Sequence, residues 1–341
     1  MKTQTLFFVI LAICIFIIIA CAIINTCIDK NMENYTNGNY ELKSINLKGT
    51  RREYYISNET SKKVLIFFHG TGGGSLVDPS FDSLISEYQI IQPIGLPNAD
   101  GKKSWKSVDD VSCNSQADDM SLVKYLLDTY TDRDTKVYCA GFSVGSGFAA
   151  RLSVDNISSR IDGFILCSSG LQKNMINKVT NSNCNIFIAN GDDDDISPVD
   201  GGNGKIMDNN NIPCYDFSSF KDTINKWSSV VCGSNTKETV DSSDNNIYYN
   251  KRGNIVLGVI FKNTGHSHTS GSISSWINDI DGTNGNDNLF TVATRIVDGD
   301  LVFQPNNVST EQTKNTTLPP PPPRPHTRRF NRPFNPLTTT N

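Results

Sequence analysis

The sequence GFSVG at residues 141–145 has the residue types and spacing of a serine nucleophile held at a tight turn. An apolar stretch at 137–140 precedes it, and a helix-favouring stretch follows from Gly147. A sharp strand-to-helix turn exposes the serine hydroxyl, and the free N–H groups of the helix then face the charge that develops during attack. This context predicts Ser143 as the nucleophile and the backbone N–H of Val144 as an oxyanion donor, whereas the bare motif would indicate only a loop.

A second glycine-rich segment, HGTGGGS at residues 69–75, follows the apolar stretch 64–68. A loop of this kind after an early strand can turn backbone N–H groups towards a substrate oxyanion. It lacks both the G-x-G-x-x-G spacing of a dinucleotide site and the lysine of a phosphate-binding loop. We therefore expect a second oxyanion donor near Thr71.

A serine nucleophile needs a base, and the chain has four histidines. His326 lies among prolines near the end of the chain, and His69 belongs to the glycine loop. The remaining two, His266 and His268, follow the apolar stretch 255–261. A neutral imidazole there can accept the serine proton and return it to the leaving group. The preceding glycine permits a tight loop and favours His266, with His268 as the alternative.

A carboxylate should orient the histidine, and four consecutive aspartates occupy residues 192–195. They follow an apolar stretch and stand between the serine and the histidines, which is the chain order Ser, Asp, His. Four adjacent acids repel one another, so most must be solvated, paired, or bound to a cation such as calcium. Position alone leaves open which of the four meets the histidine.

The elements that must position these residues alternate along the chain. Stretches typical of strands and helices imply an α/β fold, with a mostly parallel central sheet and helices on both faces. The expected strands are 40–47, 52–56, 64–68, 90–94, 137–140, 163–167, 185–189 and 255–261, and the clearest helices are 119–130 and 289–297. These elements define a catalytic domain at residues 40–305.

The amino-terminal segment predicts export. Residues 6–24 form an uninterrupted apolar run after a short start, residues 1–5, and about 19 such residues approach the length that spans a bilayer. We expect a single transmembrane signal-anchor, a stalk at 25–39 and a catalytic domain on the extracytoplasmic side of the membrane. Cleavage near Ala22, which would release a secreted protein, and lipidation at Cys21 are the alternatives.

The remaining composition limits the partners of the chain. A net charge of −4 gives no indication of nucleic-acid binding, and the nine cysteines lack metal-ligand spacing, so we expect no cofactor or metal. Disulfides are possible after export, but their pairing cannot be read from the sequence. Residues 306–341 should form an extended, disordered, proline-rich tail. Five sequons predict a glycoprotein: Asn34, Asn58, Asn156, Asn307 and Asn315.

Together these motifs resemble the polyhydroxybutyrate depolymerase and feruloyl esterase group of α/β-hydrolases, over residues 64–297. Besides the glycine loop, GFSVG and a Gly-His pair, the family has a segment similar to NGDDDDISPVDGG at 190–202. Its Pro198 and Gly-Gly pair set a register that places the family's aspartate at Asp194, with Asp195 as the nearest competitor. The resemblance also implies a pocket role for Trp105. Val144 after the serine and Asn190 before Gly191 depart from the residues that are usual in the family.

These observations predict a serine esterase that forms an acyl-enzyme with Ser143, His266 and Asp194. The expected substrate is an ester, including polymeric ones such as a polyester or a feruloylated or acylated polysaccharide. Two alternatives stay open. A serine peptidase of the same fold would usually need an additional capping domain. A non-catalytic ectodomain used for recognition would share the fold without needing all three residues.

Overall fold

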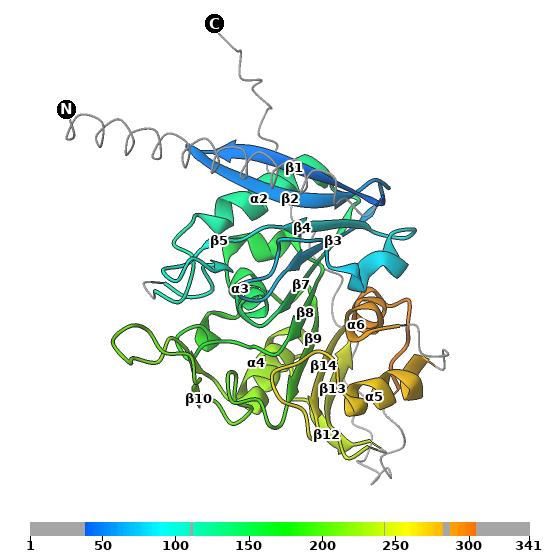
Figure 1. Cartoon of the computed structure of the whole chain (residues 1–341). Coiled ribbons are helices and arrows are strands. Elements are labelled where there is room, and N and C mark those ends of the chain that lie inside the picture. Colours follow the sequence, from blue (N-terminus) through cyan, green and yellow to red (C-terminus); the bar gives the residue numbers. More distant parts are fainter. Residues whose placement is uncertain (1–37, 110–111, 242, 282–286, 305–341) are drawn as a thin grey trace, which may run out of the picture. The chain divides into compact units, whose positions relative to one another are not determined.

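The protein is described by a computed structural model that covers residues 38–304, except 110–111, 242 and 282–286 (Figure 1). The predicted membrane anchor, nearly all of the stalk and the proline-rich tail therefore lie outside the described residues, as do Asn34, Asn307 and Asn315. Within the described part of the chain, no helix has the length and apolar character needed to span a bilayer. The other two sequon asparagines, Asn58 and Asn156, are exposed.

The core of the fold is a ten-stranded sheet with the order β1-β2-β4-β3-β7-β8-β9-β14-β13-β12. The six central strands from β4 to β14 run parallel, and the pairs at both edges are antiparallel. The strands are β1 (Tyr40–Leu47), β2 (Thr50–Ser57), β3 (Lys63–Phe68), β4 (Gln89–Pro93), β7 (Lys136–Phe142), β8 (Gly163–Cys167), β9 (Asn185–Gly191), β12 (Lys237–Val240), β13 (Asn246–Arg252) and β14 (Asn254–Phe261).

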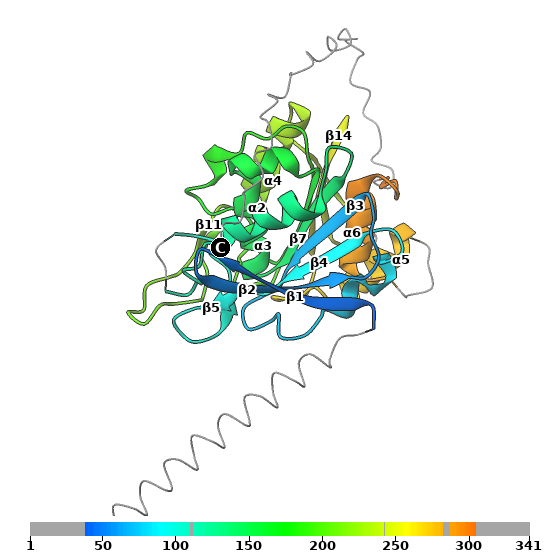
Figure 2. The same ribbon diagram turned by 90° about the horizontal axis from the view of Figure 1, so that it is seen from above.

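Helices cover both faces of this sheet (Figure 2). One apolar cluster joins the sheet to α2 (Asp119–Tyr130), α3 (Val144–Ser153) and α4 (Phe220–Cys232). A second cluster on the opposite face joins it to the 3₁₀ helix η1 (Pro79–Leu84), α5 (Gly271–Asp281) and α6 (Leu289–Asp298). Because both faces are buried, the central strands are continuous apolar runs without polar alternation. The predicted class, a mostly parallel sheet between helices, is confirmed.

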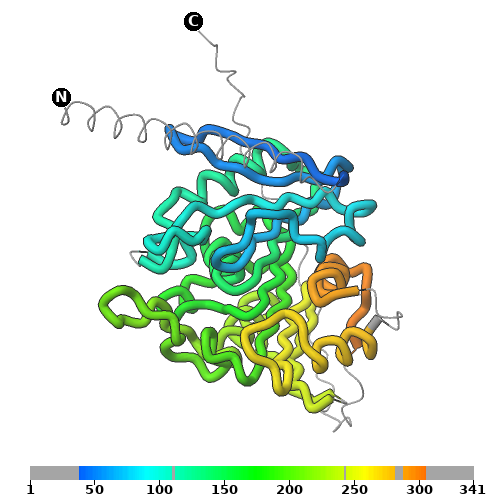
Figure 3. Tube along the Cα trace, viewed as in Figure 1, coloured from blue at the N-terminus to red at the C-terminus, as the bar shows by residue number. Residues whose placement is uncertain are grey.

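Several elements were not predicted from the sequence, namely the β12–β13 hairpin extension, α4 and α5. The hairpin strands are largely polar and partly exposed, because they form the edge of the sheet. Helix α4 contains β-branched residues and serines that weaken its intrinsic propensity, so its stability comes from packing Trp227 and Ile224 against the sheet. Of these elements, only the hairpin strands β13 and β12 continue the sheet beyond β14, at the end opposite β1 in the trace of Figure 3.

The cysteines divide into two groups. Cys113 and Cys214, which are 101 residues apart, form a disulfide between the loop before α2 and the loop before α4. Four further cysteines are free and buried in the described structure: Cys139, Cys167, Cys184 and Cys232. Burial raises the pKa of the Cys139 thiol, so this residue serves as a small apolar core side chain.

Candidate active site

Ser143 lies at the turn between β7 and α3, with an unusual backbone conformation. Its φ of 54° and ψ of −123° place a non-glycine residue in a region that costs on the order of 1–3 kcal/mol. The surrounding structure holds it there, because its N–H donates to the Cys167 carbonyl (3.0 Å) and its carbonyl accepts from the Gly147 N–H (3.0 Å). The residue therefore combines strained backbone with a side chain that stands out from the sheet, as the sequence context predicts.

Gly145, two residues after the serine, must be glycine because of close packing and not because of its backbone conformation. A Cβ on Gly145 would lie 2.0 Å from the Phe68 carbonyl oxygen, which belongs to the neighbouring strand β3. The first turn of α3 can therefore approach the end of β3 only because residue 145 has no side chain. This close approach brings the helix N-terminus beside the glycine loop.

The structure brings together the three residues predicted to act as nucleophile, base and acid. The Ser143 hydroxyl lies 2.7 Å from His266 Nε2, and His266 Nδ1 lies 2.9 Å from Asp194 Oδ2. The carboxylate accepts the Nδ1 proton, so Nε2 is left unprotonated and accepts the Ser143 proton. The Asp194 side chain is fully buried and that of His266 is 15% exposed. The arrangement is a continuous hydrogen-bond chain from a buried carboxylate to a serine hydroxyl.

The four consecutive aspartates have four different environments. Asp194 also accepts hydrogen bonds from the N–H groups of Ile196 (3.0 Å) and Ser197 (2.8 Å). Asp192 pairs with a lysine at 3.4 Å, and the exposed Asp195 pairs with another. Asp193 is exposed. Among the described residues, no group of three or more His, Cys, Asp or Glu side chains is placed to hold a metal ion.

Two residues at the end of β9 hold the aspartate loop against the histidine loop. A Cβ on Gly191 would lie 1.9 Å from the Thr264 carbonyl oxygen, so only glycine allows the two loops to touch. The Asn190 amide donates to the Ser197 carbonyl (3.0 Å) and closes the aspartate loop on itself. Asn190 was noted in the sequence only as a departure from a family pattern, and the structure gives it this bracing contact.

The glycine loop is held by a buried histidine and a buried tryptophan. The Gly95 N–H donates to His69 Nε2 (3.0 Å), so the neutral ring carries its proton on Nδ1 and donates it to the Gly70 carbonyl (2.7 Å). The Trp105 indole N–H donates to the His69 carbonyl (2.9 Å). Trp105 is fully buried and stacks on the Phe148 ring. The prediction that Trp105 contacts substrate is therefore wrong, because the ring has no surface to offer. Trp105 instead supports the glycine loop through its hydrogen bond to the His69 carbonyl.

The two predicted oxyanion donors come from two different segments, helix α3 and the glycine loop. Val144 is the first residue of α3, where a backbone N–H has no acceptor within its own helix. Thr71 lies exposed in the glycine loop, after Gly70, where an added Cβ would sit 3.4 Å from the Ser143 Cβ. The N–H of Gly72 is already used, because it donates to the Lys103 carbonyl (2.8 Å). The roles of Thr71 and Val144 remain predictions.

The buried His69 predicts a pH dependence of stability. Burial lowers its pKa to about 4, so the folded protein keeps the ring neutral where the unfolded chain, with a pKa near 6.5, binds a proton. The free energy of unfolding is therefore unaffected by this histidine above pH 6.5. As the pH falls from 6.5 towards 4, protonation of the unfolded chain lowers the free energy of unfolding by about 3 kcal/mol. Urea unfolding of wild type should show this slope, and His69→Gln should flatten it. Equal slopes for both proteins would contradict the interpretation.

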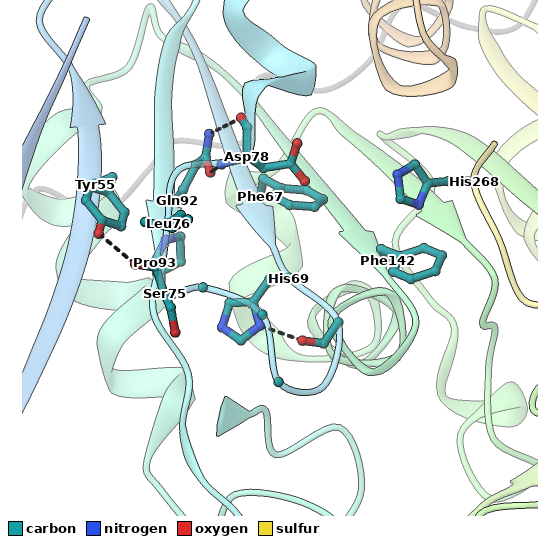
Figure 4. Close-up of a pocket in the computed structure, with 14 residues that line it drawn as sticks. Tyr55, Phe67, His69, Ser75, Leu76, Asp78, Gln92, Pro93, Phe142 and His268 are labelled. Atoms are coloured by element: carbon teal, nitrogen blue, oxygen red, sulfur yellow. Dashed lines mark hydrogen bonds between the residues drawn. The ribbon is translucent and has the colours of Figure 1, made fainter. Parts of the chain in front are cut away.

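His268, the alternative candidate for the base, is partly buried beside the site. Its ring packs edge-on against Phe142 at 4.6 Å and lies 5.5 Å from Phe290. Among the described residues its buried Nδ1 has no hydrogen-bond partner, and burial lowers its pKa. Figure 4 shows it at the wall of a cavity of about 360 Å³, opposite the glycine loop. His266, and not His268, reaches Ser143.

Sequence reasoning missed a second strained serine beside the site. Ser168 directly follows β8 and has a φ of 55°. Its hydroxyl donates to the carbonyl of Ser267 (3.1 Å), the residue after His266. It therefore steadies the histidine loop from the neighbouring strand. Its position directly after a central parallel strand was the available signal, because such residues gather at one edge of the sheet.

The order of the strands, the strained turn at the serine and the chain order Ser, Asp, His are those of the α/β-hydrolase fold that the sequence predicts. No family model matches the sequence, and no curated protein matches it.

Solved structures with similar folds include several esterases. An acetyl xylan esterase from Aspergillus awamori has a TM-score of 0.43 and 12% identity, over 66% of this chain and 94% of its own. A thermostable esterase has a TM-score of 0.41 and 13% identity, over 57% of this chain. This chain spans about half, 52%, of that esterase. At these values the likenesses carry no argument about activity.

Proposed function

We propose that this protein is a serine hydrolase that cleaves carboxylic esters. The observation that carries the proposal is the hydrogen-bond chain from the buried Asp194 through His266 to the Ser143 hydroxyl. A structural serine has no need of a neutral imidazole held in one tautomer by a buried carboxylate. The same three groups in the same relation perform acyl transfer in unrelated folds.

The first half of the reaction transfers the acyl group to the enzyme. The Ser143 Oγ attacks the ester carbonyl carbon while His266 Nε2 takes the hydroxyl proton, and Asp194 stabilises the resulting imidazolium. The tetrahedral oxyanion accepts hydrogen bonds from the Val144 N–H and from an N–H of the glycine loop near Thr71. As the bond between carbonyl carbon and alkoxy oxygen breaks, His266 returns the proton to that oxygen, and the alcohol leaves.

The second half restores the enzyme by the same route. A water gives one proton to His266 Nε2 and attacks the acyl carbon, so the bond from that carbon to Ser143 Oγ breaks. The proton returns to Oγ and the carboxylic acid departs. Preorganised N–H donors at the oxyanion are worth about 10²–10³ in turnover each in comparable sites, so the strained turn at Ser143 contributes directly to rate.

The setting of the enzyme is part of this proposal. The apolar run at residues 6–24 supports a membrane anchor that leaves the hydrolase domain on the extracytoplasmic side. The exposed sequon asparagines Asn58 and Asn156 and the disulfide between Cys113 and Cys214 are compatible with an oxidising compartment. Closer kinship with the polyhydroxybutyrate depolymerase and feruloyl esterase group rests on the motifs alone.

Covalent labelling tests the proposal directly. A fluorophosphonate probe should label the folded protein at a ratio of about one per chain, and peptide mapping should place the label on Ser143, because the activated Oγ attacks phosphorus as it attacks a carbonyl. Prior unfolding in urea should prevent labelling. A folded protein that resists the probe and hydrolyses no ester would instead favour the recognition module.

A further inference from the structure

A small, partly enclosed space, called the slot below, lies directly beside Ser143. It has a volume of about 20 Å³ and is bounded by Ser143, His266 and mostly buried side chains. A cavity of roughly 10–15 Å³ by this measure holds one water, so the space admits about one group of that size, such as a methyl. Gln172, Ile206, Tyr215 and Phe217 are among the other residues that line it.

The walls of this slot are fixed by contacts outside it. The Tyr215 hydroxyl donates to the Asn114 amide oxygen (2.8 Å), which also accepts from the Ser107 hydroxyl (3.3 Å). Residues 113 and 214, the neighbours of Asn114 and Tyr215, are joined by the disulfide. The Gln172 side chain accepts from the Asp216 N–H (2.9 Å). Polar groups that are already paired do not turn aside to admit a longer chain without losing those bonds.

The order in which the two products leave indicates that the slot binds the acyl portion of the ester. The alcohol leaves while the acyl group is still bonded to Ser143, so the alcohol needs an open route and the acyl group can occupy an enclosed space. The larger cavity of about 360 Å³ has Phe142 and the glycine loop in its wall, but Ser143 is not among its lining residues in the described structure. It therefore does not receive the atom bonded to the reacting carbonyl.

We propose that the enzyme is selective for acetyl esters, with the acetyl methyl in the slot that Ile206 helps to line. The inference rests on the proposed function and narrows it. It excludes the feruloyl and hydroxybutyryl groups that the family resemblance implies, because each extends well beyond one methyl from the carbonyl carbon. Acetylated alcohols and polysaccharides remain substrates in chemical terms, since the alcohol portion is unrestricted by the slot.

A series of p-nitrophenyl esters that differ only in the acyl group tests the proposal. One methylene in an apolar pocket changes discrimination by about 10–200-fold, so acetate should exceed butyrate in kcat/KM by at least about 100-fold, and octanoate should not be hydrolysed measurably. Ile206→Ala should raise butyrate turnover and narrow the ratio by about tenfold or more. Ile206→Val should give an intermediate ratio and guards against misfolding of the alanine variant.

Ile212→Ala is the matched control, because Ile212 is the same residue type on the same loop and is 59% exposed, away from the slot. It should leave the acyl ratio unchanged. If wild type hydrolyses butyrate as well as acetate in a Ser143-dependent manner, the acetyl assignment fails and the esterase proposal survives. If no ester including acetate is hydrolysed, the proposed function itself fails.

Discussion

Ser143→Ala should abolish hydrolysis of p-nitrophenyl acetate while leaving the fold intact. The hydroxyl oxygen is the atom that attacks, and its removal leaves His266 Nε2 with nothing to activate except water. Loss of a triad serine in a comparable protease costs on the order of 10⁶ in turnover. Far-ultraviolet circular dichroism and the urea midpoint should match wild type within error, because alanine keeps the Cβ of the turn. A folded Ser143→Ala protein with wild-type turnover would end the proposal.

The base assignment can be tested with the same assay. His266→Ala should be almost as severe, and the double variant Ser143→Ala with His266→Ala should be scarcely worse than either single one, because the two residues act as a unit. His268→Ala is the natural comparison, since its ring lies two residues away and makes no bond to Ser143. It should alter affinity or preference more than turnover. If His268→Ala were the inactive variant, the mechanism would stand with the base reassigned.

Much of the fold could be predicted because its helices and strands are determined by local sequence patterns. Helix α2 was predicted with its observed bounds, since Asp118 caps it and its apolar residues recur along one face. The central strands were recognisable as apolar runs bounded by turns. Their ends then located the site, because the carboxyl ends of parallel strands share one edge of the sheet. Thus Ser143, the aspartate loop and the histidine loop were each expected after a strand.

The remaining features depend on contacts between distant segments, which local pattern does not record. Gly265 was taken to favour His266 through a tight turn, yet it does not adopt a positive φ. The glycine that matters there is Gly191, whose missing side chain admits the Thr264 carbonyl. Trp105 was expected at the substrate and lies in the core. Three residues that line the slot, Ile206, Tyr215 and Phe217, come from a loop beyond residue 200. The disulfide, the Tyr215 hydroxyl and the Asp216 N–H tie this loop to distant segments.

The aspartate cluster gives the sharpest separation between a structural and a chemical role. Asp194 is the only one of the four whose carboxylate meets His266, although sequence position alone left the four equivalent. Asp192 and Asp195 each pair with a lysine near the surface, where such pairs contribute about 0–1 kcal/mol. Replacing any of the other three by asparagine should therefore change turnover by less than about threefold, with folding unchanged.

Asp194→Asn should instead reduce turnover by about 10⁴-fold with little change in structure. The asparagine oxygen can still accept the Ile196 and Ser197 N–H groups, so the loop keeps its shape. Its amide nitrogen, however, would face His266 Nδ1 as a donor and favour the tautomer with the proton on Nε2. That proton blocks acceptance from Ser143, and no carboxylate remains to stabilise the imidazolium. Initial rates for all four Asp→Asn variants decide the matter: equal losses across the four would contradict the assignment and indicate that the cluster acts as a cation site.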